Sequence, residues 1–166
     1  LCFAGIWTIQ FLIYKVIQRY QLHQHVYALS PSEHQAKQKT PSLGGIGIVL
    51  SVIFAASIFN IWTAKILWLL GLTASFAIIG LIDDISAYFK EENKGISAKQ
   101  KSMAQVLIAA LFLGLFSHYF HTLVFWEILF FIFIIVGTSN ATNLSDGLDG
   151  LLGSLSLLTF TGFYIL

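Results

Sequence analysis

The chain has 166 residues, of which 57% are hydrophobic and only 10% are charged, and its formal net charge is +1. Soluble domains carry about a quarter of charged residues, so this composition excludes an ordinary soluble domain and indicates a chain that folds in a lipid bilayer. No basic face with interleaved aromatic residues is present, which argues against a nucleic-acid partner. The single cysteine, Cys2, excludes a disulfide framework.

Six apolar stretches without charged residues follow one another, and each predicts a membrane-spanning helix. The first, 1–14, is short because the sequence begins within it, and it lacks the basic flank and cleavage site of a signal peptide. We therefore expect an all-α, polytopic transmembrane helical bundle that forms a single domain over 1–166 and is truncated at both ends. The other stretches are 43–64, 66–82, 102–126, 128–145 and 150–166.

Charged residues define the expected orientation. Four of the nine Lys and Arg residues lie in or beside the first connection and four lie in the third, eight in all, so the positive-inside rule places the odd-numbered connections in the cytoplasm. Seven of the eight acidic residues, all except Glu127, fall on the same side. Acidic residues have little influence on topology, so we attribute their concentration to a cytoplasmic active site. The eight basic residues are Lys15, Arg19, Lys37, Lys39, Lys90, Lys94, Lys99 and Lys101.

Two adjacent carboxylates, Asp83 and Asp84, follow directly after the third apolar stretch. Neighbouring carboxylates at a helix end repel one another unless a cation or a proton offsets their charge. The pair therefore suits a hard divalent cation such as Mg²⁺, which prefers oxygen ligands. The alternative for an isolated pair is two interfacial charges that simply end a span.

Further polar clusters lie on the same expected side. If residues 140–150 are helical, Asp146 and Asp149 share a face, with Asn143 beside Asp146; a glycine-rich interfacial turn is the alternative. Lys37 can neutralise phosphate oxygens as a point charge, although the positive-inside rule explains it equally well. Ser97 is the predicted N-cap of the helix that follows it.

In this order the clusters resemble the motifs of the polyprenyl-phosphate N-acetylhexosamine-1-phosphate transferase superfamily. Residues 40–45, Thr-Pro-Ser-Leu-Gly-Gly, look like its Thr-Pro-Thr-Met-Gly-Gly signature, and residues 80–84 look like its aspartate pair. Residues 94–101 resemble its basic cytoplasmic loop, and residues 140–151 resemble its Asn-Leu-Thr-Asp-Gly-Leu-Asp-Gly-Leu signature. Within the superfamily, His34 and Lys37 before Thr-Pro favour the phospho-N-acetylmuramoyl-pentapeptide branch.

The resemblance runs from about Glu33 to the last residue and implies a Mg²⁺-dependent phosphoglycosyl transferase of the bacterial inner membrane. About six spans of a ten-span fold are expected here. The implied reaction moves phospho-MurNAc-pentapeptide from UDP-MurNAc-pentapeptide to undecaprenyl phosphate, giving lipid I and UMP for peptidoglycan synthesis. The resemblance implies that Asp83 and Asp84 are catalytic and bind the metal, and that the substrate-binding residues are Lys37, Asn143, Asp146 and Asp149.

Some features depart from the superfamily pattern. Ala87 stands where the branch has a lysine, Lys39 replaces a glycine, and the later aspartate motif and histidine cluster are absent, so we expect the 166-residue chain alone to be inactive. The alternatives are a UDP-GlcNAc:polyprenyl-phosphate GlcNAc-1-phosphate transferase and, from a different class, a cation-coupled transporter with carboxylates nearer the midplane. Direct attack by the lipid phosphate is favoured over a covalent aspartyl intermediate because the acceptor is already an anionic nucleophile. The sequence leaves a homodimer open.

Overall fold

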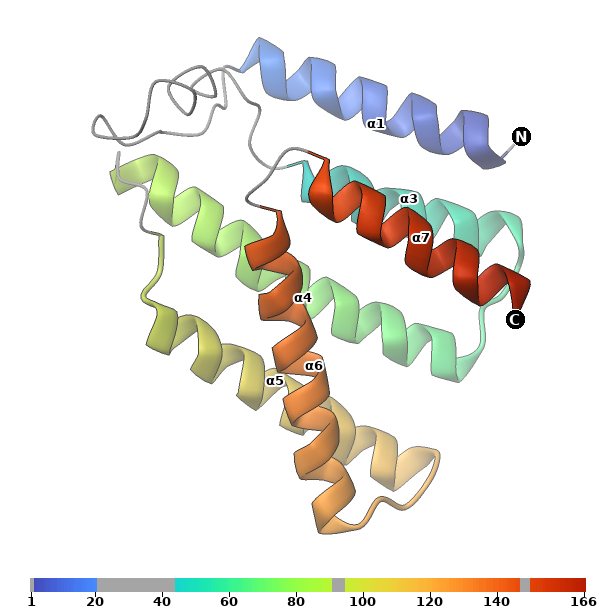
Figure 1. The fold of residues 1–166 in the computed structure, drawn as a ribbon, viewed down its shortest axis with the longest axis vertical. Helices are drawn as coiled ribbons and strands as arrows, with labels where there is room; N and C mark the ends of the chain where they lie inside the picture. Colours follow the sequence, from blue (N-terminus) through green and yellow to red (C-terminus); the bar gives the residue numbers. More distant parts are fainter. Residues whose placement is uncertain (1, 21–43, 91–94, 147–149) are drawn as a thin grey trace. The chain divides into compact units, whose positions relative to one another are not determined.

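The computed structural model describes residues 2–20, 44–90, 95–146 and 150–166, and every regular element within them is an α-helix (Figure 1). This confirms the expected all-α fold. The chain divides into two compact units, Leu1–Phe112 and Leu113–Leu166, with the boundary inside α5. The helices are α1 (Cys2–Arg19), α3 (Gly45–Ile58), α4 (Ala64–Lys90), α5 (Ala98–Tyr119), α6 (Phe125–Ser145) and α7 (Leu151–Ile165).

Three of these helices are long and apolar enough to cross a membrane: Ala64–Phe89, Ala98–Tyr119 and Phe125–Ser145. The sequence predicted six spans, and the difference lies in α1, α3 and α7. Helix α3 is apolar, but its 14 residues rise only about 21 Å, less than the roughly 30 Å of a bilayer core, and α7 is apolar over the 15 residues from Leu151 to Ile165. Helix α1 has 18 residues but includes polar side chains such as Gln10, Lys15 and Gln18.

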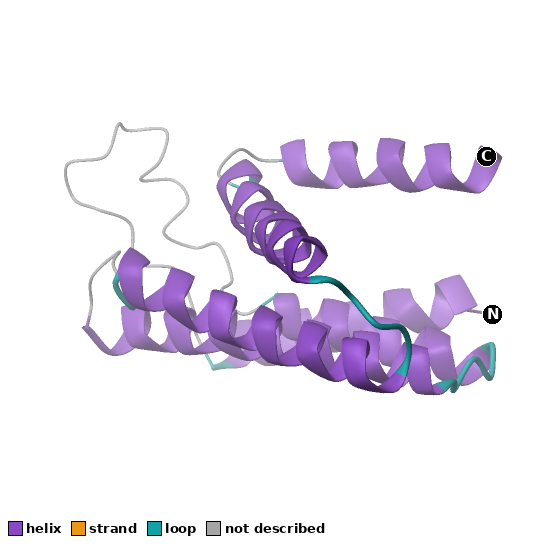
Figure 2. Cartoon of the chain, turned by 90° about the horizontal axis from the view of Figure 1, so that it is seen from below, coloured by secondary structure: helices purple, strands orange, loops and turns teal. Residues whose placement is uncertain are grey.

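The helices expose large apolar side chains on many sides. No residue of α6 or α7 is buried, and Phe133, Leu157 and Phe163 are each at least 70% exposed. A helix that is apolar all round lies in lipid or within a larger bundle. Figure 2 shows these helices connected by loops, with no strand in the part of the chain that it colours. The fold and the composition together define a multi-pass membrane protein.

In the first unit α1 packs on α3, and α3 packs on α4. Glycines allow the close approach of α1 and α3. A methyl group on Gly5 would overlap the ring of Phe54, and one on Gly47 would overlap the side-chain amide of Gln10. Small residues let helix backbones approach closely in membranes, where no hydrophobic force drives helices together.

Helix α5 begins in the same unit and runs antiparallel to α4. The indole Nε1 of Trp68 donates a hydrogen bond of 2.8 Å to the carbonyl oxygen of Phe112. The two rings meet edge to face, with centroids 6.0 Å apart. This contact joins the beginning of α4 to a later turn of α5.

The expectation that Asp83 and Asp84 end a helix is wrong. Helix α4 continues to Lys90, so the two aspartates lie inside it, about two turns before its end. Helix continuity depends on backbone hydrogen bonding rather than on apolar side chains, so a charged pair does not by itself end a helix. Helix α4 therefore carries both carboxylates as fixed side chains of a regular element.

Candidate active site

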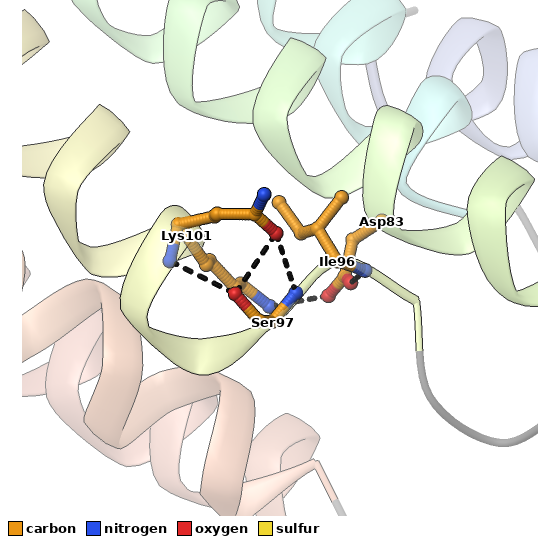
Figure 3. Close-up of polar contacts among 5 residues, drawn as sticks. Asp83, Ile96, Ser97 and Lys101 are labelled. Carbon is orange, nitrogen blue, oxygen red and sulfur yellow. Dashed lines mark hydrogen bonds and ion pairs between the residues drawn. The ribbon is translucent and has the colours of Figure 1, made fainter.

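The carboxylate of Asp83 is held by α5 and by the residues that lead into it (Figure 3). Its Oδ1 atom accepts a hydrogen bond of 3.0 Å from the backbone N–H of Ile96. Its Oδ2 atom lies 2.7 Å from Nζ of Lys101 in a salt bridge. The side chains of Lys101 and Asp83 are only 17% and 23% exposed. Asp83 thus uses both of its oxygens within the protein.

A glycine makes this approach possible. A Cβ atom on Gly95 would overlap both the side chain and the backbone carbonyl of Asp83. The carbonyl belongs to a regular helix and cannot move aside as the end of a flexible side chain could. The chain can therefore pass Asp83 at this distance only with glycine at position 95.

Ser97 caps α5, as predicted from the sequence. The backbone N–H of Gln100 donates to Oγ of Ser97 at 3.3 Å, and the backbone N–H of Ser97 donates to Oε1 of Gln100 at 3.2 Å. This reciprocal pair is a capping box, which satisfies two backbone donors at the helix start. Lys101 follows one turn after Ser97 and bonds its carbonyl through the backbone at 2.9 Å. The cap therefore fixes the turn from which Lys101 reaches Asp83, a pairing that sequence reasoning missed.

Asp84 has different surroundings from Asp83. It is exposed, and among the described residues no group donates a hydrogen bond to it or forms a salt bridge with it. It lies at one end of a groove of about 360 Å³ between α3 and α4. The rest of the groove lining is apolar and includes the small residues Gly45, Ala74, Ala77 and Gly80.

The two aspartates differ in their fitness for a magnesium ion. Mg²⁺ is usually held by one or two carboxylates, with water and substrate phosphates completing its coordination. Asp84 meets this requirement as a single carboxylate ligand with an unengaged side chain. Asp83 already accepts from Lys101 and from Ile96. In the ranges that the structure covers, no three His, Cys, Asp or Glu side chains are grouped closely enough to hold a metal by themselves.

The other predicted site residues lie elsewhere. Asn143 is exposed in the last turn of α6, and Asp146, also exposed, follows that helix and bonds the carbonyl of Thr142 through its backbone N–H at 3.2 Å. Lys37 and Asp149 lie outside the described residues. Helix α6 ends at Ser145, and Gly150 has a left-handed backbone with φ of 80°. Asn143 and Asp146 belong to the second unit, and the aspartate pair belongs to the first.

The fold and these residues define an α-helical membrane protein in which a lysine-paired carboxylate adjoins an accessible one. The model of one known family, Glycosyl transferase family 4, matches residues 66–166. That match covers more than half of the sequence and includes the aspartate pair, Lys101, Asn143 and Asp146. The chain belongs to Glycosyl transferase family 4.

Several relatives are similar over most of the chain. A phospho-N-acetylmuramoyl-pentapeptide-transferase of Desulfosudis oleivorans is 35% identical over 91% of this chain and 46% of its own length. Those of Staphylococcus aureus (strain bovine RF122) and Shouchella clausii are 35% and 32% identical, over 90% and 100% of this chain and 53% and 56% of their own lengths. The resemblance seen in the motifs is thereby confirmed. The chain spans about half the length of the curated relatives it matches.

Proposed function

We propose that the protein containing this chain transfers phospho-MurNAc-pentapeptide from UDP-MurNAc-pentapeptide to undecaprenyl phosphate, giving lipid I and UMP. The names of the relatives and the family membership support this reaction. The structural observation that carries it is Asp84, an unengaged carboxylate at the end of an apolar groove and adjacent to the Asp83–Lys101 pair. Such a site suits charged phosphate chemistry beside a lipid.

The proposed reaction is a direct displacement at phosphorus. An oxygen of the lipid phosphate bonds to the phosphorus that carries the sugar, while the bond from this phosphorus to the bridging oxygen breaks. UMP leaves with the bridging oxygen and with the electron pair of the broken bond. The nucleophile is already an anion, so no general base is required.

The residues of this chain then hold and orient the reactants. The catalytic centre lies at the aspartate pair, where Asp84 is the carboxylate available to the reacting phosphates and to Mg²⁺. When bound, Mg²⁺ offsets the negative charge of the pyrophosphate and of the departing UMP. We assign the nucleotide part of the donor to Lys37, Asn143, Asp146 and Asp149, on the resemblance of their motifs. We place the site on the cytoplasmic face of the bacterial inner membrane, where eight of the nine basic residues are expected.

The test uses the full-length protein purified in detergent with undecaprenyl phosphate. UMP release and the lipid product are measured with UDP-MurNAc-pentapeptide, with UDP-GlcNAc, and with both donors in competition, over a range of Mg²⁺ concentrations. We expect lipid I from the first donor and little turnover of the second. Preferential use of UDP-GlcNAc would identify a GlcNAc-1-phosphate transferase instead. No UMP release from either donor, by a folded protein, would rule out both enzymes.

A further inference from the structure

We propose that Lys101 and Asp83 act as one positioning unit, which locks the start of α5 onto α4 and leaves Asp84 alone to contact the reacting phosphates or their metal. The proposal rests on the function proposed above and assigns unequal roles to two adjacent aspartates. Lys101 thereby becomes a positioning residue that never touches substrate.

The first argument is the direction of the two side chains. Adjacent residues of an α-helix point about 100° apart, so they face different neighbours. Asp83 faces the start of α5, where Lys101 of the helix and Ile96, which precedes it, bind its oxygens (Figure 3). Asp84 lines the groove between α4 and α3. A single helix thus presents one carboxylate to the protein and the next to a cavity.

The second argument is that Asp83 is enclosed. One of its oxygens is bound to a lysine, the other is bound to a backbone N–H, and Gly95 lies in contact with it. A metal ion would have to displace the Lys101 ammonium or the Ile96 N–H in order to reach either oxygen. Removing one partner of a mostly buried ion pair leaves the other as an uncompensated charge, which is strongly destabilising.

The third argument is the position of the contact of Asp83 with Lys101 and Ile96, which we call the lock. Asp83 and Asp84 are adjacent in the backbone of α4, so any movement of Asp83 also moves Asp84. The lock connects this point of α4 to the capped first turn of α5, which Ser97 and Gln100 hold in place. Misplacing a reacting group by about 1 Å can cost on the order of 10²-fold in rate. Loss of the lock should therefore lower turnover through the position of Asp84.

The test is a double-mutant cycle in the full-length enzyme with Asp83→Asn, Lys101→Met and the combined variant. If the two residues act as one unit, each single change lowers kcat by about 10- to 100-fold and the combined variant is no worse than the poorer single one. If Asp83 is instead a metal ligand and Lys101 a separate phosphate contact, the two losses multiply. Multiplication in folded variants overturns the proposal.

Three further variants separate the two roles. Lys101→Arg keeps the charge and should restore at least part of the turnover lost in Lys101→Met. Lys99→Met removes an exposed lysine two residues earlier and should lose far less than Lys101→Met. The Mg²⁺ concentration for half-maximal rate should rise in Asp84→Asn and stay nearly constant in Asp83→Asn. A rise of the same size in both aspartate variants contradicts the unequal roles.

A distance measurement tests the lock without any catalysis. Spin labels at Phe89→Cys on α4 and Met103→Cys on α5, both exposed positions, are introduced with other cysteines replaced. The distance distribution between them should broaden in Lys101→Met and remain narrow in Lys99→Met. An unchanged distribution in Lys101→Met would refute the lock. Because this readout needs no substrate, it separates failure of the lock from failure of the proposed reaction.

Discussion

At the scale of single residues, solvation distinguishes Asp83 from Asp84. Asp83 is only 23% exposed and exchanges its water for a lysine and a backbone N–H, whereas Asp84 stays exposed at the end of a groove. A carboxylate in water or beside a cavity can accept a cation without first losing another partner. The site chemistry therefore depends on which way each side chain points, not on the number of carboxylates.

Asp84→Asn in the full-length enzyme should lower kcat by about 10² to 10³-fold. The change keeps size and hydrogen-bonding capacity but removes a charge, and a charge-stabilising contact of about 3 to 4 kcal/mol in the transition state gives this loss. UMP release at saturating substrate and graded Mg²⁺ measures it. Glu127→Gln is the matched control, because within the described residues Glu127 accepts a hydrogen bond only from the backbone N–H of Val124 at the start of α6. Near-normal turnover by Asp84→Asn would falsify its proposed role.

Asp146→Asn should affect donor binding more than turnover. Asp146 is exposed just after α6. We propose, from its motif, that it binds the nucleotide part of the donor. We expect KM for UDP-MurNAc-pentapeptide to rise about tenfold, roughly 1.4 kcal/mol of binding, with kcat changed much less. Steady-state kinetics with the lipid acceptor held saturating separates the two constants. A fall in kcat at constant KM would place Asp146 in the chemical step instead.

At the scale of elements, close contacts and caps determine where the helices begin and how closely they pack. The capping box at Ser97 sets where α5 begins, and the contact between Gly5 and Phe54 sets how near α1 comes to α3. In α4 the pattern of apolar residues predicted an end at Ile82, yet the helix continues through the aspartates to Lys90. Its last two turns bring Asp83 within reach of α5.

Gly5→Ala should destabilise the protein because the new methyl group would overlap the ring of Phe54. Overpacking of this kind costs about 1 to 3 kcal/mol, and the companion change Phe54→Leu should recover part of it. Gly114→Ala is the control, since its Cβ would meet no described atom within 4 Å apart from its chain neighbours and the nearby backbone of its own helix. The midpoint of thermal unfolding in detergent reports all three variants. Equal effects of the two alanine substitutions would argue against close packing of α1 on α3.

At the scale of the whole molecule, the bilayer acts as the solvent. The exposed apolar side chains of α6 and α7, the three membrane-length helices and the distribution of lysines all follow from the cost of placing charge in hydrocarbon. The same cost keeps most charged residues near helix ends and in connections, and the pair inside α4 lies within its last two turns. The proposed donor-binding site, built from the polar motifs, must then face one aqueous compartment.

That orientation can be tested with cysteine labelling in intact cells. A cysteine at Ala98, beside the basic residues 94–101, should resist a membrane-impermeant maleimide added from outside until the cells are permeabilised. A cysteine at Thr122, in the connection between α5 and α6, should react without permeabilisation, because that connection carries no Lys or Arg. The reverse labelling pattern would invert the topology and remove the donor from the proposed site.

The sequence alone determined that the chain folds in a lipid bilayer and that it is all-helical. It also determined the approximate positions of the helices and the motifs that identify the family. These properties follow from apolar runs, charge clusters and caps, each of which is local along the chain. The tertiary structure decided that Asp83 pairs with Lys101 while Asp84 lines a groove against α3. Pairing between residues 83 and 101 depends on the antiparallel packing of α4 and α5 and on the absence of a side chain at Gly95. The spacing of residues along the sequence shows neither of these features. The different surroundings of the adjacent residues Asp83 and Asp84 therefore became visible only in the tertiary structure.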